Sequence, residues 1–182
     1  MIGIKEKIEK AIPLMEEKLQ KKNRYALPRL VKVVVSSGTG HAKDKTRNEL
    51  VADRLAKITG QKTSARRAKQ SIASFKLREG DTIGYAVTLR GARMYGFLDK
   101  LINATLPRTK DFKGVPPTGI DEAGNLTIGI KEHSIFPEAA EEEIRDLFGL
   151  AVTIVTTAKN RNEARALFDA MGIPFGKNKE KR

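Results

Sequence analysis

Hydrophobic residues recur at helical spacing from the start of the chain. Residues three or four positions apart fall on one face of an α-helix, and the basic stretch 21–24 ends the first such stripe. The stripe consists of Ile4, Ile8, Ile12, Met15 and Leu19. This pattern predicts an amphipathic helix at the N-terminal end of the chain.

Later segments alternate between strand-like and helix-like patterns. Runs rich in β-branched and aromatic residues, such as Val33 to Val35, predict strands at 30–35, 82–90, 125–130 and 150–156. Stripes at helical spacing predict helices at 50–58, 94–102, 138–148 and 162–171. Gly60 is expected as the left-handed cap of the first of these, and Asn162 as the N-cap of the last.

This order of elements predicts the fold class. Strands separated by helices, but joined in one place by long loops, indicate an α+β fold: a mixed, mainly antiparallel sheet with helices packed on one face and the other face open. The 182 residues, 40% of them hydrophobic, suffice for one domain with its own core. We expect a single domain over 1–176 and a charged, disordered tail over 177–182.

The charge balance changes the picture by indicating a partner. The chain has 35 Lys and Arg against 22 Asp and Glu, a net charge of +13 and a pI near 10.0, which favours a polyanion. A membrane is disfavoured because no apolar run approaches the ~20 residues that span a bilayer. The first helix also mixes acids with bases. Nucleic acid remains, and the open sheet face is a natural platform for RNA.

The chain contains no cysteine, which excludes disulfides and cysteine-ligated zinc and fits a reducing cytoplasm. Residues 1–12 alternate charges with isoleucines and lack the apolar segment of a secretory signal. We therefore expect a cytoplasmic location.

The positive charge is unevenly distributed along the chain. Residues 62–78 contain six bases and no acid, whereas residues 114–172 contain five bases and ten acids. The basic run can neutralise several phosphates, with serine hydroxyls positioning the RNA backbone. Phe75 within it has two open interpretations, which are stacking on an unpaired base and packing into the core. For the charges together we favour RNA binding over a merely solvated loop.

Catalytic constellations are hard to assemble from this sequence. Ser37-Gly38-Thr39-Gly40 follows a strand, as a dinucleotide-binding turn does, but Lys43 stands where the third glycine would be. The histidines His41 and His133 have no partners at ligand spacing, so we expect both as polar surface or supporting residues. The acids of 138–146 suit a solvated helix N-terminus better than a metal site. We expect no catalytic residue, metal or cofactor.

Several longer strings carry a family resemblance. They are Leu27-Pro28-Arg29-Leu30, Ile58-Thr59-Gly60-Gln61-Lys62, the block 67–78, Leu106-Pro107-Arg108, Ile128-Gly129-Ile130 and Gly172-Ile173-Pro174-Phe175. In this order, and over nearly the whole chain, they resemble the bacterial large-subunit ribosomal protein five family. That family binds 5S ribosomal RNA (5S rRNA) and is not enzymatic.

The resemblance implies a structural protein of the central protuberance of the large subunit. The implied 5S rRNA-binding residues are Ser36, Ser37, Gly38, Gly40, Gln61, Lys62, Thr88 and Arg90. Ser36 is a departure, because the family usually has asparagine there and a hydroxyl replaces only part of an amide's hydrogen bonding.

The resemblance also implies contacts with other partners. The loop 68–80 is expected to protrude with fixed ends and a free tip, and to reach the transfer RNA (tRNA) in the peptidyl site. Its implied contact residues are Arg67, Lys69, Ser71, Ser74, Phe75, Lys76 and Arg78. The acidic region 114–146 is expected to face a basic small-subunit head protein in an intersubunit bridge. We also expect contact with 23S rRNA, no membrane and no homo-oligomer.

Two other functions are kept as alternatives. A nucleotide-dependent enzyme is disfavoured by the missing third glycine. A free-standing RNA-binding regulator has the same sequence features and differs only in not sedimenting with the large subunit.

Overall fold

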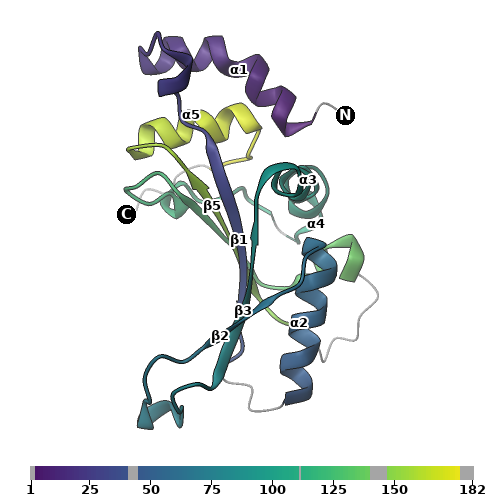
Figure 1. Cartoon of the computed structure of the whole chain (residues 1–182). Coiled ribbons are helices and arrows are strands. Elements are labelled where there is room, and N and C mark those ends of the chain that lie inside the picture. The colour runs from purple at the N-terminus through teal and green to yellow at the C-terminus, as the bar shows by residue number, and fades with distance from the viewer. Residues whose placement is uncertain (1–2, 41–44, 111, 140–146, 177–182) are drawn as a thin grey trace, which may run out of the picture. The chain divides into compact units, whose positions relative to one another are not determined.

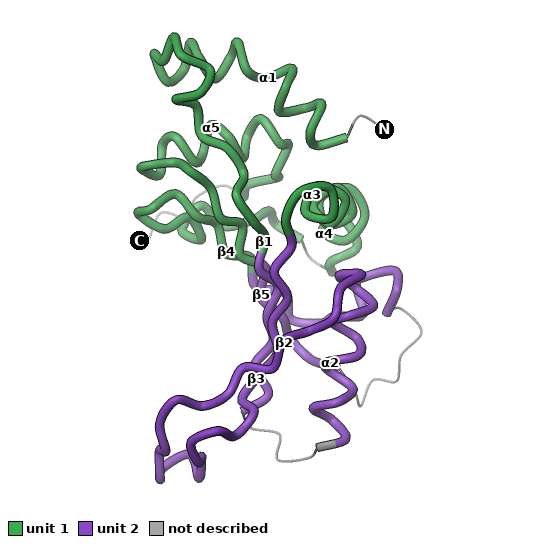
Figure 2. The backbone as a smooth tube through the Cα atoms, viewed as in Figure 1, with its two compact units in different colours: residues 1–33, 90–128, 153–182 green, residues 34–89, 129–152 purple. Residues whose placement is uncertain are grey.

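The computed structural model describes residues 3–40, 45–110, 112–139 and 147–176. The chain forms two compact units, shown in different colours in Figure 2. Unit 1 comprises residues 1–33, 90–128 and 153–182, and unit 2 comprises residues 34–89 and 129–152. The single domain expected over 1–176 stays a prediction, and the tail 177–182 lies outside the described residues.

Five strands in the described part of the chain follow the order β2-β3-β1-β5-β4 (Figure 1). They form an open antiparallel sheet, which confirms the α+β class. Their bounds are β1 Leu30–Gly38, β2 Ser64–Arg67, β3 Thr82–Leu89, β4 Leu126–Ile130 and β5 Leu150–Thr156. The sequence predicted all but β2. All four side chains of β2 are exposed, so the sequence of this strand shows no alternation of apolar and polar residues that would predict it.

Unit 1 is built around three helices, α1 Ile4–Leu19, α3 Gly91–Lys100 and α5 Arg161–Met171. α1 packs on α5 and on α3, and the Ile4 backbone N–H donates to Asp99 Oδ1 at 2.8 Å. α3 continues without a break through a π-helix, Leu101–Thr105, into α4 Leu106–Arg108, and short 3-10 helices occupy Arg24–Ala26 and Pro117–Gly119. The fully buried side chains of this unit include Ile4, Leu98, Leu101, Leu126, Ile154, Leu167, Phe168 and Met171. The predicted N-terminal helix is thereby confirmed.

The last helix begins earlier than predicted. Asn160, and not Asn162, is its N-cap, because the Asn160 side chain accepts a hydrogen bond from the Glu163 backbone N–H at 2.9 Å. Asn162 lies inside the first turn. An Asn followed three residues later by Glu is itself a start signal, and the prediction overlooked it. Gly172, with φ 80°, ends the helix as a left-handed cap.

Unit 2 places helix α2, Lys45–Thr59, against β3 and the turn Pro137–Ala139. Gly60 follows α2 with φ 65°, as the predicted left-handed cap requires. The buried apolar side chains of this unit include Val35, Leu55, Ile58, Leu89 and Phe136. For the predicted helix 138–148, residues 140–146 lie outside the described part, and the turn before them is a short 3-10 helix.

His133 belongs to this core and not to the surface, which corrects the expectation from sequence. It is fully buried, and its ring stacks on that of Phe148 with centroids 4.0 Å apart. Its Nδ1 accepts the Phe148 backbone N–H at 3.3 Å. Buried polar groups are normally hydrogen-bonded. The bond to Phe148 satisfies this requirement, so the His133 ring can pack within the core. His41 lies outside the described residues.

Candidate nucleic-acid interface

The end of β1 presents its two serines differently. Successive residues of a strand point to opposite faces, and Val33, Val35 and Ser37 are buried while Ser36 is half-buried. The Ser37 hydroxyl donates to the Gly149 carbonyl at 2.7 Å. Ser37 therefore holds the strand end in place, and Ser36 offers the more accessible hydroxyl.

Gly38 and Gly40 are glycines that the fold itself does not need. Neither has positive φ. Among the described residues, a Cβ on Gly38 would meet no atom within 4 Å, and one on Gly40 would lie 4.0 Å from the Ile83 carbonyl oxygen. Gly84 contrasts with them, since its Cβ would lie 2.6 Å from the Ser37 carbonyl oxygen. Glycine at 38 and 40 thus leaves open space beside the backbone, which suits close approach by a ligand.

Gln61 is held onto the neighbouring strand. It directly follows the cap Gly60, and its Nε2 donates to the Thr88 carbonyl at 3.1 Å. The family resemblance implied Gln61 and Thr88 as two separate binding residues. In the structure they are hydrogen-bonded to each other, although they lie 27 positions apart in the sequence. A side chain fixed in this way loses little conformational entropy on binding. Lys62, the next residue, is exposed.

The pairing of β2 with β3 adds a residue that the sequence did not single out for the 5S site. Ser64 lies opposite Ala86 and Arg66 opposite Gly84. Opposed residues share a face, and so do residues two apart in a strand. Arg66 therefore lies on the same face as Thr88, with its side chain exposed. Only the register reveals this. Arg90 is exposed too, but it belongs to unit 1, at the N-cap of α3.

Residues 68–81 form a hydrogen-bonded extension of the β2–β3 hairpin, which we call the hairpin tip. Ala68 N–H donates to the Asp81 carbonyl at 2.8 Å, and Ile72 and Leu77 exchange backbone hydrogen bonds at 3.0 and 3.1 Å. Between them lie a 3-10 turn and Lys76 in the left-handed region, with φ 50°. The tip protrudes within unit 2, as expected (Figure 2). Backbone hydrogen bonds link residues within the tip as well as at its ends, and the freedom of the tip stays a prediction.

The side chains of the hairpin tip are mostly exposed. Phe75 is 65% exposed, so the interpretation that it packs into the core is wrong. Ser71 supports the backbone, since its Oγ accepts the Glu79 N–H at 2.9 Å. The other exposed candidates on or beside the tip are Arg67, Lys69, Ser74, Lys76 and Arg78. An exposed aromatic ring among bases is the combination that stacks bases and contacts phosphates.

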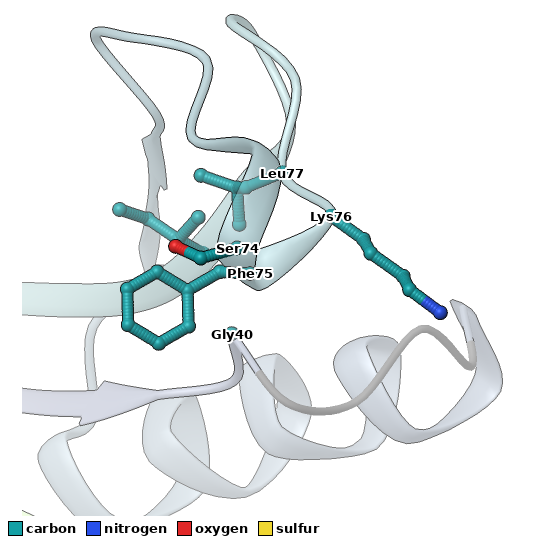
Figure 3. A pocket seen from close by; sticks show the side chains of 6 residues that line it. Gly40, Ser74, Phe75, Lys76 and Leu77 are labelled. Atoms are coloured by element: carbon teal, nitrogen blue, oxygen red, sulfur yellow. The ribbon is translucent and has the colours of Figure 1, made fainter.

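A groove of about 430 Å³ lies between the tip and the end of β1 (Figure 3). It is lined by Gly40, Ser74, Phe75, Lys76, Leu77 and Ile83. Figure 3 shows the Phe75 ring and the Lys76 side chain pointing in different directions from the tip. The structure thus brings Gly40, expected at the 5S site, beside Phe75, expected at the tRNA site.

Other kinds of site are not found in the described part of the chain. No group of three or more His, Asp or Glu side chains there is arranged to hold a metal ion. None of its helices is long and apolar enough to cross a membrane.

Comparison with known proteins identifies the chain. The family model "Ribosomal protein L5" matches residues 23–78, and the model of the C-terminus of the same ribosomal protein family matches residues 82–175. The chain is 47% identical over 179 residues to "Large ribosomal subunit protein uL5" of Thermoanaerobacter sp. (strain X514), covering 97% of this chain and 100% of the relative. The protein of that name from Thermotoga sp. (strain RQ2) is 46% identical, with 96% of each chain covered.

These matches first define the class. The chain is a ribosomal protein and not an enzyme. More particularly, it belongs to the ribosomal protein L5 family. The family resemblance and the expected location on the ribosome are thereby confirmed.

Proposed function

We propose that this structural protein of the large ribosomal subunit binds 5S rRNA through unit 2. The contact surface comprises Ser36, Gly38, Gly40, Gln61, Lys62 and Thr88, with Ser37 positioning the strand end and Arg90 following β3 in the chain. The observation that carries the proposal is the open space beside Gly38 and Gly40, two glycines that the fold does not require. Among the described residues, no atom lies within 4 Å of the place where a Gly38 Cβ would stand, so RNA backbone can approach there.

The polar groups of this surface make different kinds of contact with the RNA. Gln61, fixed on the Thr88 carbonyl, presents an amide of set orientation. Ser36 supplies one hydroxyl in place of the amide usual in the family, so it makes fewer hydrogen bonds. Lys62 and Arg66 are exposed and neutralise phosphates.

The hairpin tip is proposed to contact tRNA in the peptidyl site. Support comes from its hydrogen-bonded backbone, the exposed Phe75 ring and the exposed Lys69, Lys76 and Arg78. A hydrogen-bonded extension that carries basic side chains and an aromatic ring can contact a second RNA that does not touch the sheet face.

The acidic region 114–146 is proposed to meet a basic small-subunit head protein. Residues 140–146 lie outside the described residues. Among those described, Asp121, Glu122, Glu132 and Glu138 are exposed. The Asn125 side chain hydrogen bonds to Asp121 at 2.9 Å and, with the Asn125 backbone N–H, lowers the pKa of that carboxyl.

The defining experiment is binding of the full chain to 5S rRNA against a scrambled RNA of equal length. We expect retention of 5S rRNA only, at physiological salt. Lys and Arg side chains that contact phosphates displace the counterions condensed on the RNA. The logarithm of the affinity is therefore expected to fall as the logarithm of the salt concentration rises, by roughly 0.7 to 0.9 per contacted phosphate. Equal retention of both RNAs, or a flat salt response, would contradict the proposal.

A Gln61→Ala variant is expected to weaken 5S binding by ~1 to 3 kcal/mol, because it leaves RNA hydrogen-bonding groups unpaired. Losing the bond to the Thr88 carbonyl also costs about 1 kcal/mol of stability, so the variant still folds. Filter binding and thermal melting measure the two effects. Gln70→Ala, at an exposed glutamine of the hairpin tip, is the matched control with unchanged 5S binding. An unfolded Gln61→Ala protein would mean that Gln61 is scaffold only.

A further inference from the structure

A second basic surface lies in unit 1, in the turn between α1 and β1. We call residues 20–29 the Tyr25 turn. It lies inside the stretch 18–43, which contains seven bases and no acid. Tyr25 is 80% exposed, more than the other large hydrophobic side chains on the described surface. None of the residues assigned to 5S rRNA or tRNA above belongs to this turn.

Hydrogen bonds and caps hold the backbone of the turn on both sides of Tyr25. Gln20 ends α1 in the left-handed region, and the Lys21 backbone N–H donates to the Glu16 carbonyl at 3.1 Å. The Asn23 side chain accepts the Tyr25 backbone N–H at 2.9 Å and caps the 3-10 helix Arg24–Ala26. Leu27 and Pro28 are buried directly after it. The fold thus holds the ring out into solvent.

One base of the turn is structural. Lys21 Nζ lies 2.8 Å from Glu163 Oε1 and donates to the Ala26 carbonyl at 3.2 Å, linking the turn to α5. Hydrogen bonding by Lys21 lowers the pKa of Glu163. The Glu163 carboxylate, which is mostly buried, is therefore neutralised by this pair and does not offset the remaining bases.

The remaining bases are available. Lys22, Arg24 and Arg29 are exposed, and none makes an ion pair with any residue that the structure describes. Arg29 is joined to the end of β5, since its backbone N–H donates to Thr157 Oγ1 and its carbonyl accepts the Thr157 N–H, both at 2.9 Å. That segment adds the exposed Lys159, whose backbone N–H donates to Glu163.

We propose that the Tyr25 turn binds a single-stranded segment of large-subunit ribosomal RNA outside the 5S rRNA. Lys22, Arg24 and Arg29 contact its phosphates, and an unpaired base stacks on Tyr25. This inference rests on the proposed function only in assuming that the protein is surrounded by ribosomal RNA in the large subunit. A protein partner fits less well, because a stretch of seven bases without an acid favours a polyanion.

The direct test places a benzophenone amino acid at position 25 of the full chain and irradiates large subunits that contain it. The expected result is an adduct to large-subunit ribosomal RNA at an unpaired nucleotide outside the 5S rRNA. An adduct confined to a protein, an adduct confined to 5S rRNA, or no adduct in fully assembled subunits would overturn the inference.

Substitutions give a second, independent measurement. An Arg24→Gln/Tyr25→Ala/Arg29→Gln variant is expected to leave large subunits at lower salt, with retention at fixed salt reduced roughly tenfold. Tyr25→Phe keeps the stacking ring and is expected to be retained like the parent. Lys5→Gln/Lys10→Gln removes as much charge from the exposed first turns of α1 and serves as the charge control.

Isolated-protein binding to 5S rRNA separates this inference from the proposed function. The triple variant is expected to bind 5S rRNA within about twofold of the parent, while retention in the subunit falls. Unchanged retention, or an equal fall in the charge control, would overturn the role of the Tyr25 turn and leave the 5S site standing. Failure of the parent to bind 5S rRNA would overturn the 5S site alone, because the adduct at position 25 does not depend on it.

Discussion

A Gly38→Asp variant is expected to fold like the parent and to lose at least about 100-fold in affinity for 5S rRNA. The new Cβ meets no atom within 4 Å, and the backbone there lacks the positive φ that would strain a side chain. The carboxylate instead enters the space proposed for RNA backbone, where like charges facing each other cost several kcal/mol. Filter binding of 5S rRNA and thermal melting measure affinity and stability separately.

Gly129→Asp is the matched control for this variant. Gly129 is exposed, lies in β4 within unit 2, has no positive φ and also has no atom within 4 Å of an added Cβ. The same charge is therefore introduced at equal structural cost outside the proposed surface. We expect 5S affinity within about twofold of the parent. If both variants bind alike, the open space beside Gly38 has no bearing on RNA.

The second large effect is expected from replacing Lys69, Lys76 and Arg78 together by alanine. Individual exposed charge contacts contribute only ~0.2 to 1 kcal/mol, so three are needed for a clear loss. Peptidyl-site tRNA occupancy of ribosomes carrying the variant is expected to fall about tenfold. Affinity for 5S rRNA is expected to stay within a few-fold, since none of the three replaced residues belongs to the proposed 5S surface.

The control for the triple variant removes three exposed bases from unit 1, at Lys5, Lys10 and Lys110. It changes net charge equally and is expected to leave tRNA occupancy unchanged. Outright loss of 5S binding by the hairpin-tip variant would assign the tip to 5S rRNA. Normal peptidyl-site occupancy would remove it from the tRNA contact.

Element type was predictable wherever the hydrophobic period was strong. β5 lies at 150–156 as predicted because its buried and partly exposed residues alternate strictly, and α1 follows its isoleucine stripe. β2 escaped prediction because a strand held by backbone pairing with β3 needs no apolar side chains. The N-cap of α5 was misplaced by two residues because the prediction took the nearer of two asparagines and passed over Asn160, although Glu163 follows Asn160 at capping-box spacing.

By itself, the sequence determined the α+β class, the basic character and the family, because periodicity, charge and motif order are properties of the chain alone. Tertiary structure alone decided which candidates are available to RNA. It buried Ser37 and His133, exposed Phe75, joined Gln61 to Thr88 and put Arg66 on their face of the hairpin. It also showed that Lys21 is paired with Glu163, whereas the Tyr25 side chain is exposed to solvent. Exposure and pairing depend on residues distant in sequence, and no local pattern encodes them.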